Sequence, residues 1–403
     1  MFKKITSLDN IRQAYNEVFE LFYLEGKANR YKGLDGLNLN SFNLSAFDLI
    51  KQIRNEMINF VEIDPALNIY IPKKHKPEKD REIFIYNIKE RIKAQAIYRC
   101  LFEVFDARFS DRLFSYRPGK SPYRAAQLVC RRYRKSFKDN YVFTADLSNF
   151  SGEIDRALMI KKLSSFIEDK SVLKLLELFI NARFYFRGGF LKPQRGLVIG
   201  CPVFGLLTNF YLSEIDFKYS ARSKFYLRLG DDLIMIDPDL QKIEKNKKEF
   251  LEDVSGLKLK INLDKIFLGK ASDHFSYLGY DFSNGLISLP DDFVKRFKHN
   301  LNSLLVNRNN HKDYKIKIIK RLMKNPQKNF NNIFKEIARI KSQINDVEQI
   351  KALSEYFFRA LTEFLFNKYN SRNRRLLVSE LSKNKISITS LYKAYSKFHY
   401  ERG

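Results

Sequence analysis

The chain has 403 residues, 44% of them hydrophobic, and its 73 Lys and Arg against 46 Asp and Glu give a formal net charge of +27. That length allows a large core and two or three subdomains, and that charge predicts a polyanionic partner, either nucleic acid or an anionic membrane surface. The three cysteines are too far apart for a disulfide framework or a zinc-type cluster, and no apolar run reaches membrane-spanning length.

The aromatic residues, the cysteines and the start of the chain bear on the kind of partner and on the cellular compartment. The 22 Tyr and 36 Phe favour nucleic acid over a membrane, because bases stack on aromatic rings, although most of the Phe are expected to fill the core. The scarcity of cysteine predicts a reduced, cytoplasmic protein. The N-terminus continues with polar residues rather than with the apolar region of a signal peptide.

Residues 1–140 are predicted to form helices and one basic hairpin. A strand at Ile69–Ile71 runs into the basic segment Pro72–Arg81 and returns as Glu82–Tyr86. This loop either holds phosphates or is a solvated charged turn. Basic residues around Gly119 fit both a phosphate site and an ordinary helix start. Apolar residues at helix spacing predict helices at Ile11–Tyr23, Ser45–Phe60, Ile88–Phe105 and Pro122–Tyr133.

The middle of the chain alternates strands, helices and glycine-containing loops. A strand that begins at Tyr141 ends in Asp146. From there to the C-terminus the patterns predict a helix from Asp155, further helix over Ser164–Ile180, a hairpin at Phe184–Leu191, a glycine-punctuated loop over Gly196–Gly205 with a long helix to about Tyr219, a helix at Leu240–Val254, strands at Leu257–Ile261 and Phe275–Tyr280, and a wholly helical, basic region over 291–403.

The segment Tyr226–Ile236 places two adjacent acids between two runs of strand-forming residues. This order predicts a β-hairpin with Asp231 and Asp232 at its tip. Adjacent carboxylates repel each other unless water or a cation separates them. A surface turn supplies the water and a Mg²⁺ site supplies the cation, so this segment alone leaves both interpretations open.

Asp146 adds a third carboxylate to the pattern. It ends a different strand, and the glycine-punctuated loop with its long helix lies between it and Asp231. Three carboxylates from two strands are what two-metal phosphoryl transfer requires, because one metal activates the attacking 3′-hydroxyl and both stabilise the pentavalent phosphorus. This combination is far more specific than an Asp-Asp pair alone.

With these motifs in this order, residues 65–290 resemble bacterial reverse transcriptases of the group II intron and retron kind, closest to abortive-infection or defence-associated members. The matching segments are Ile71-Pro-Lys with Lys79-x-Arg81, Tyr116-Arg-Pro-Gly-Lys-Ser, Asp146-Leu-Ser-Asn-Phe, Gly196-x-x-x-Gly200 with Asn209-x-Tyr-Leu, Leu229-Gly-Asp-Asp, Gly256-Leu-x-Leu through Asn262-Leu-Asp-Lys265, and Phe275-x-Tyr-Leu-Gly-Tyr. The resemblance implies an α+β right-hand polymerase with helical fingers, an antiparallel-sheet palm and an all-helical thumb. The implied domains are N-terminal helices and fingers over 1–140, a palm over 141–290 with a fingers insertion near 160–195, and a thumb-like domain over 291–403.

The resemblance also implies roles for single residues. Lys79 and Arg81 would neutralise the incoming triphosphate. Lys265 would protonate or stabilise the leaving pyrophosphate, or else form a salt bridge on the palm surface. Two Mg²⁺ ions, or Mn²⁺, would be held by Asp146, Leu147, Asp231 and Asp232. The other implied nucleotide-binding residues are Arg117, Leu147, Phe150, Ser151 and Gly200.

Three positions depart from the family pattern. The hairpin reads Leu-Gly-Asp-Asp, with Leu229-Gly230 where the family has an aromatic-Ala pair or similar before the acids. The family's Pro-Gln-Gly loop is Val198-Ile199-Gly200, and its later Ser-Pro is Phe204-Gly205. Ser151 stands where the family has a bulky aromatic ring that blocks a ribose 2′-hydroxyl, with Phe150 just before it.

Three functions remain in competition. The first is an RNA-directed DNA polymerase in antiphage defence, which uses an RNA template, nucleotide triphosphates and a DNA, RNA or protein primer, with a structured non-coding RNA as a further partner. The second is a template-independent or ribonucleotide-using polymerase on the same fold. The third is a non-catalytic nucleic-acid-binding module, which the intact acid triad disfavours. No membrane partner is expected, and the oligomeric state is left open.

Overall fold

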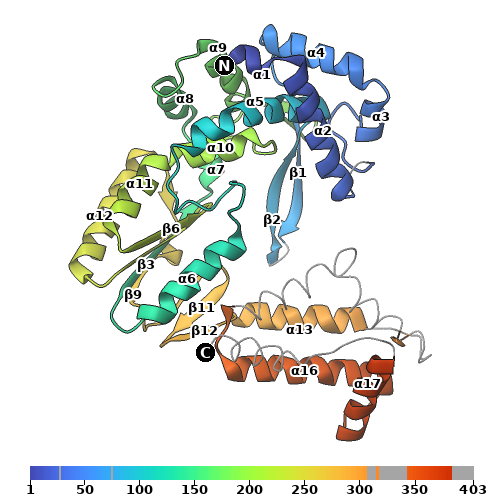
Figure 1. The fold of residues 1–403 in the computed structure, drawn as a ribbon, viewed down its shortest axis with the longest axis vertical. Helices are drawn as coiled ribbons and strands as arrows, with labels where there is room; N and C mark the ends of the chain where they lie inside the picture. Colours follow the sequence, from blue (N-terminus) through green and yellow to red (C-terminus); the bar gives the residue numbers. More distant parts are fainter. Residues whose placement is uncertain (27–28, 74–75, 306–314, 317–342, 384–403) are drawn as a thin grey trace. The chain divides into compact units, whose positions relative to one another are not determined.

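The computed structural model describes residues 1–26, 29–73, 76–305, 315–316 and 343–383. The chain divides into two compact units. Unit 1 comprises Met1–Ser121 with Val142–Leu268, and unit 2 comprises Pro122–Tyr141 with Gly269–Gly403. Their helices and strands are drawn in Figure 1. Within the described residues, no helix combines the length and the apolar composition needed to cross a membrane.

Unit 1 begins with a layer of helices around α5, which is buried along most of its length. Ile92, Ala96 and Ile97 on α5 are fully buried, as expected for a helix that is covered on several sides. Ser7 caps α2 by accepting a hydrogen bond from the backbone N–H of Asn10. The helices of this layer are α1 (Phe2–Ile5), α2 (Leu8–Leu24), α3 (Leu39–Asn43), α4 (Ala46–Ile58) and α5 (Ile88–Asp106).

A four-stranded sheet, the hairpin sheet, contains the basic hairpin of the sequence. Its order is β2-β1-β4-β5. The short pair β4–β5 lies far along the chain but joins the hairpin through a parallel pairing of Ala66 with Phe184. Tyr70 and Phe186 make an edge-to-face ring contact across that junction. The strands are β1 (Ala66–Lys73), β2 (Lys76–Ile85), β4 (Phe184–Phe186) and β5 (Gly189–Leu191).

A five-stranded sheet, the central sheet, holds the acids. Its path is β6-β7-β3-β8, and β9 also pairs with β3. Six consecutive residues of β3 are buried, as expected for a strand that is covered on both faces of its sheet. The strands are β3 (Tyr141–Ser148), β6 (Phe225–Leu229), β7 (Asp232–Asp237), β8 (Lys260–Ile261) and β9 (Phe267–Lys270).

Six helices accompany the central sheet, and two of the predicted long helices are interrupted. The predicted helix through Ser164–Ile180 is wrong at its start, because α8 ends at Ser164 and Asp169 caps a new helix. The predicted helix to Tyr219 is divided at Leu212. The helices are α7 (Phe150–Glu153), α8 (Arg156–Ser164), α9 (Lys170–Ile180), α10 (Val203–Tyr211), α11 (Ser213–Arg222) and α12 (Leu240–Gly256).

Unit 2 combines a small antiparallel sheet with helices. The predicted strand Phe275–Tyr280 is a hairpin, since Leu278 and Gly279 both have positive φ and the chain reverses there. Phe275 and Phe282 stack across the hairpin, and Tyr133 of α6 packs edge-on against both rings. The elements are α6 (Pro122–Ser136), β10 (Phe275–Tyr277), β11 (Tyr280–Ser283), β12 (Leu286–Ser288), α13 (Asp291–Leu305), α16 (Val347–Phe366) and α17 (Ser371–Lys383).

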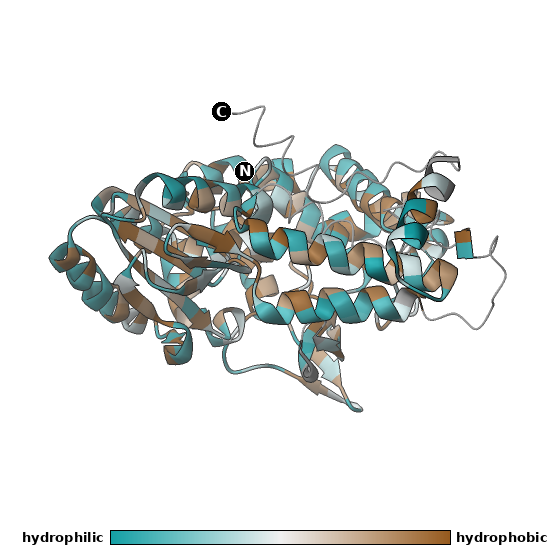
Figure 2. Cartoon of the chain, turned by 90° about the horizontal axis from the view of Figure 1, so that it is seen from below, coloured by the Kyte–Doolittle hydropathy of each residue, from teal (hydrophilic) through white to brown (hydrophobic). Residues whose placement is uncertain are grey.

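The distribution of apolar residues follows these elements. Strands of the central sheet are mostly hydrophobic, whereas helices show both hydrophobic and hydrophilic residues (Figure 2). Cys100, Cys130 and Cys201 are buried free thiols, as the sequence spacing predicts. Beyond residue 290 the described segments are helical. The predicted division at residues 140 and 290 stays a prediction, because compactness groups 122–141 and 269–290 with the C-terminal helices.

Candidate active site

The Asp-Asp segment forms the hairpin that the sequence predicts. Leu229 of β6 pairs with Asp232 of β7, so Gly230 and Asp231 form a two-residue loop. Gly230 has φ +68°, and Asp231 is not among the residues with positive φ. A positive φ at only the first loop position is the pattern of a type II′ turn, which favours glycine there. Gly230, the departure from the family pattern, is therefore suited to the turn geometry.

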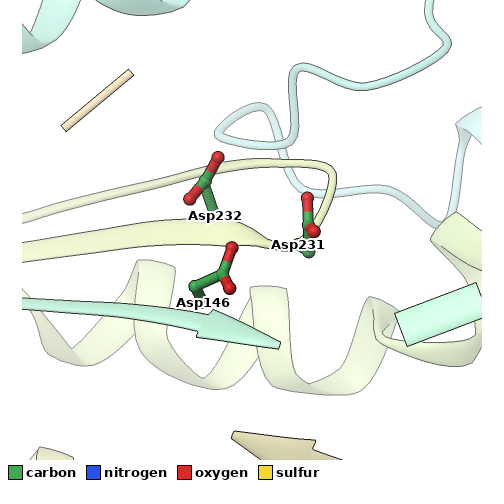
Figure 3. A group of neighbouring side chains, drawn as sticks. All are labelled: Asp146, Asp231 and Asp232. Atoms are coloured by element: carbon green, nitrogen blue, oxygen red, sulfur yellow. The ribbon is translucent and has the colours of Figure 1, made fainter. Parts of the chain in front are cut away.

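Three carboxylates meet at this turn, as Figure 3 shows. Asp146 comes from β3, Asp231 from the loop and Asp232 from the first position of β7. One ligand oxygen from each lies within 4.8 Å of the others. The backbone holds the two strands in this register, because the N–H of Leu147 donates to the carbonyl of Asp231 at 3.1 Å. The three carboxylates among the predicted metal ligands are thus brought together by neighbouring strands of one sheet.

The proximity of the acids changes their proton affinities. Loss of hydrating water raises the pKa of Asp231, although the residue as a whole remains exposed, and the charge of Asp146 adds to the rise. Burial, followed by the charges of Asp231 and Asp146, raises the pKa of Asp232 to about 7. The cluster therefore holds its negative charges less favourably than isolated carboxylates do, and a cation between them would relieve that repulsion.

Lys265 supplies one positive charge to the cluster. It lies on the short 3₁₀ turn η1 (Leu263–Lys265), and its Nζ is 2.8 Å from Asp146 Oδ2. Partial burial lowers the pKa of Lys265, but the bond to Asp146 and the charges of all three acids outweigh it, so the pKa is raised. The side chain is still 57% exposed. The salt bridge that the sequence left as one option is therefore present, and a solvent-facing ammonium group remains at the site.

The donor set of this cluster fits a hard divalent cation. Carboxylate oxygens are the ligands that Mg²⁺ and Mn²⁺ prefer, and one or two carboxylates with substrate phosphates complete a Mg²⁺ shell. Within the described part of the chain, the acidic, cysteine or histidine side chains whose ligand atoms lie close enough together to share one ion are Asp146, Asp231 and Asp232. The raised pKa values of Asp231 and Asp232 also favour a bound cation, because a cation would relieve the repulsion between the carboxylates.

A second part of the site is the loop that begins at Gly196, which lies directly on α7. Its backbone N–H groups at Gly196 and Leu197 donate to the carbonyls of Ile154 at 2.8 Å and Ser151 at 2.9 Å. A Cβ on Gly196 would lie 2.5 Å from the carbonyl oxygen of Gly152. This contact requires glycine, and it fixes the loop against the short helix that carries Phe150 and Ser151.

Two buried side chains and the half-buried Arg91 hold the loop at alternate carbonyls, a role that the sequence did not reveal. Arg156 Nε donates to Gly196 O at 2.7 Å, Tyr86 Oη donates to Val198 O at 2.6 Å, and an amino group of Arg91 donates to Gly200 O at 2.5 Å. Arg156 lies on α8, Tyr86 directly follows β2, and Arg91 lies on α5. Arg156 and Tyr86 are 8% and 0% exposed, so these bonds are shielded from water.

The predicted nucleotide-binding residues next to this loop differ in exposure. Phe150 is 8% exposed, whereas Ser151 is half-buried. Leu147 is 1% exposed and contributes its backbone to the central sheet. A Cβ on Gly200 would lie 2.5 Å from the carbonyl oxygen of Phe84, so the loop here packs closely on the end of the hairpin sheet.

The basic residues of the two predicted phosphate motifs are placed differently. Arg81 is exposed on β2 and pairs with Ile71 across the hairpin. Lys79 lies on β2, but its side chain is outside the described residues. Both remain predictions as triphosphate ligands.

Arg117, the basic residue of the second motif, has internal hydrogen-bond partners. Its Nε donates to Asp106 at 2.6 Å, and one amino group donates to the carbonyls of Ser110 at 2.7 Å and Leu113 at 3.2 Å. The residue is 9% exposed. A guanidinium with these internal acceptors braces the segment before α6, because moving it outward would leave buried carbonyls unpaired. Its role as a nucleotide ligand stays a prediction.

Gly196 provides a direct test of the loop contact. Gly196→Ala is expected to cost more stability than Gly188→Ala, because both glycines have positive φ but a Cβ on Gly188 meets no atom within 4 Å. The backbone strain, about 1–3 kcal/mol, is common to both, and overpacking adds about 1–3 kcal/mol at Gly196 only. Urea unfolding of the two variants measures the difference, and equal losses would contradict the close packing of the loop on Gly152.

The central sheet and its three acids define a polymerase palm, and the comparisons with known proteins agree with that class. The family profile described as reverse transcriptase (RNA-dependent DNA polymerase) matches residues 71–282, more than half of the chain. The chain belongs to this family. It is therefore a nucleotidyltransferase of the RNA-directed DNA polymerase class, with the α+β right-hand fold that the sequence motifs predict.

Individual relatives are distant. Protein YkfC of Escherichia coli is 22% identical over 70% of this chain and 86% of its own length. The COX1/OXI3 intron 2 protein of Saccharomyces cerevisiae is 22% identical over 76% of this chain, which spans only 42% of that protein. A solved structure of telomerase from Candida albicans with a fragment of telomeric RNA aligns with 89% of this chain and 68% of its own, at 12% identity and a TM-score of 0.46.

Proposed function

We propose that the protein extends a primer 3′-hydroxyl by copying an RNA template into DNA, with two divalent metal ions, Mg²⁺ or Mn²⁺, at the acid cluster. The observation that carries this proposal is that three carboxylate oxygens lie within 4.8 Å of one another on the central sheet of a chain that belongs to the reverse transcriptase family. Family membership supports the reaction class, and the donor chemistry of the cluster supports the metal.

Each residue at the cluster would have its own role in this reaction. Asp146, Asp231 and Asp232 would hold the ions, with the Leu147 carbonyl as a further oxygen. Bound there, the ions activate the attacking hydroxyl and neutralise charge on the transferred phosphoryl group. Lys265 lies 2.8 Å from Asp146 with a side chain that is 57% exposed, and its ammonium group would add positive charge for the leaving pyrophosphate. Arg81 and Lys79 would neutralise the rest of the triphosphate from β2.

The deciding experiment is incubation of the purified chain with Mg²⁺ and either deoxynucleotides or ribonucleotides, with and without an RNA template on a DNA primer. Nuclease typing of the product then identifies it. Template-dependent, DNase-sensitive product is the expected result. Product that forms equally well without a template would contradict templated synthesis and indicate terminal addition of nucleotides instead.

A second product is favoured by one observation. Ser151 is half-buried at the position where the family has a bulky ring, and Phe150 beside it is 8% exposed. An open pocket at this place would admit a ribose 2′-hydroxyl. Ribonucleotide incorporation by the same active site is therefore the alternative function, and the same assay with labelled ribonucleotides separates it from DNA synthesis.

Nucleic-acid binding should depend steeply on salt, because the formal charge is +27. Each phosphate that a lysine or arginine neutralises contributes about −0.9 to the slope of log affinity against log salt for duplex DNA, and about −0.7 for single strands. Fluorescence anisotropy with a labelled RNA–DNA hybrid and with a single strand, at increasing KCl concentration, measures both slopes. Affinity that does not change with salt would contradict an electrostatic interface.

The biological setting rests on the resemblance to defence-associated reverse transcriptases alone. We propose a cytoplasmic role in antiphage defence, in which a structured non-coding RNA serves as template or partner. Phage plating on bacteria that express wild-type protein or the Asp232→Ala variant tests the role. Equal plating efficiency on the two strains would remove it and leave the polymerase activity untouched.

A further inference from the structure

Arg228 is a buried arginine in the middle of an otherwise apolar strand. Its side chain is 1% exposed, and that of its partner Asp216 on α11 is 0% exposed. Nε donates to Asp216 Oδ1 at 2.7 Å and one amino group donates to Oδ2 at 2.6 Å. This is the two-point contact that a planar guanidinium makes with a carboxylate and that a lysine ammonium does not reproduce.

The remaining amino group of Arg228 reaches the turn that carries the acids. It donates to the carbonyl oxygen of Gly230 at 2.8 Å. That oxygen belongs to the peptide group that joins Gly230 to Asp231, so the bond fixes the plane from which Asp231 projects. An arginine that uses three nitrogens in this way links a carboxylate on α11 rigidly to the first residue of the turn.

Other bonds hold the same turn from different directions. The Gly230 N–H donates to the side-chain oxygen of Ser115, and the carbonyl of Asp231 accepts from Leu147 N at 3.1 Å. Arg228 itself is anchored at its backbone, because its N–H donates to Arg112 O at 3.0 Å and its carbonyl accepts from Phe114 N at 2.9 Å. Arg228 is therefore fixed at both ends, and its guanidinium has little freedom to move relative to the turn.

Tyr226 completes the network on the side of Asp216. Its hydroxyl donates to Asp216 Oδ1 at 2.7 Å. Tyr226 and Arg228 are two residues apart on one strand, so their side chains lie on the same face of the sheet. Three bonds from two residues of β6 thus orient one buried carboxylate.

A buried ion pair is weak support for stability, because apolar residues of similar size often replace one without loss. The bond from this pair to the acid-bearing turn points to a different role. We propose that the Arg228–Asp216 pair is a positioning device that orients the Gly230–Asp231 peptide and thereby sets the affinity of the three acids for divalent metal. The inference rests on the proposed function and adds to it the residues that hold the metal ligands in place.

The first test is Arg228→Lys, studied by calorimetric titration of the full chain with Mn²⁺ alone. The lysine keeps the positive charge beside Asp216 but loses the bond to Gly230. Substitution of a residue that orients a metal ligand typically lowers metal affinity about 10- to 100-fold, and we expect a loss in that range. Thermal unfolding in EDTA serves to show that the variant is folded. A folded variant with wild-type Mn²⁺ affinity would overturn the proposal.

A second variant covers the case in which Arg228→Lys fails to fold. Arg228→Met combined with Asp216→Leu removes both charges together and leaves no unpaired buried ion. It is expected to fold and to show the same loss of Mn²⁺ affinity, since the bond to Gly230 is absent. Unchanged affinity in the folded double variant would overturn the proposal as firmly as the first test.

Two tyrosines give a matched control on neighbouring elements. Tyr226→Phe removes the hydroxyl bonded to Asp216, whereas Tyr219→Phe removes the hydroxyl of an equally buried tyrosine, which donates to Asp253 at 2.7 Å. Mn²⁺ affinity should fall only in Tyr226→Phe. Equal affinities in the two variants would contradict the proposal, and absence of Mn²⁺ binding by the wild type would overturn the proposed function together with it.

Discussion

Asp231→Ala or Asp232→Ala is expected to abolish nucleotide incorporation while the fold persists. Each substitution removes one of three carboxylates whose oxygens lie within 4.8 Å of one another. A bound metal supplies several kcal/mol of charge stabilisation in phosphoryl transfer, and about 1.4 kcal/mol corresponds to a factor of ten in rate. A loss of about a thousand-fold or more is therefore expected. Primer extension with excess enzyme over long times measures it.

The same substitutions should not weaken the metal-free fold. The pKa of Asp232 is raised to about 7 in the folded chain. Its stabilising contribution is present at low pH, where the carboxyl is protonated, and is lost as the pH rises through about 7. At pH 8 in EDTA, Asp232→Ala is therefore expected to unfold at or above the wild-type temperature.

Asp264→Ala is the matched control for the acid cluster. Asp264 is an exposed acid on η1, next to Lys265 but outside the group of three. This variant should keep wild-type incorporation. Near-wild-type incorporation by folded Asp231→Ala or Asp232→Ala would remove the two-metal hypothesis, whatever the result at Asp264.

Ser151→Tyr is expected to suppress ribonucleotide use and to spare deoxynucleotide use. A ring at this position would collide with a ribose 2′-hydroxyl, and a serine would leave that space open. Exclusion of one group from a pocket is worth about 1–3 kcal/mol, or about 10- to 200-fold in selectivity. The wild type should therefore discriminate weakly, and the variant more strongly by about that factor. The measurement is kcat/KM for matched deoxy- and ribonucleotides on one primer.

Phe150→Ala separates the two residues that could form the gate. Phe150 is 8% exposed and Ser151 is half-buried, so the side chain with access to solvent at this position is the serine. Phe150→Ala should then lower stability through a core cavity without changing sugar selectivity. Strong rejection of ribonucleotides by the wild type, unchanged in Phe150→Ala, would place the gate elsewhere.

Most helices and the acid-bearing hairpin could be predicted from the sequence, because their signals are local. Helix spacing predicts α2, α4, α5, α6 and α12 to within a few residues. Gly-Asp-Asp between two runs of strand formers predicts the hairpin, since only the two loop residues and their neighbours decide its geometry. The order of motifs was sufficient to predict the family.

Local signals did not predict the short interruptions within the helical segments. The interruptions at Asp169 and Leu212 lie inside continuous helical patterns. At Asp169 the side chain caps a new helix and also accepts from the backbone N–H of Phe2 at 3.0 Å. A partner so distant in sequence leaves no trace in the local pattern, so tertiary contact decided this boundary.

Only the tertiary structure decided which polar side chains serve the site. Arg117 lies in a motif that predicts phosphate binding, but Asp106 and nearby carbonyls occupy its guanidinium. Arg228 lies in an apolar strand whose pattern predicts no role for it, but its bonds to Asp216 and Gly230 make it the support of the acid-bearing turn. The sequence determines which residues carry charge and at what spacing. Which acceptor each charge meets depends on contacts between distant segments, because a long side chain in a buried site takes the partner that folding places within hydrogen-bond reach.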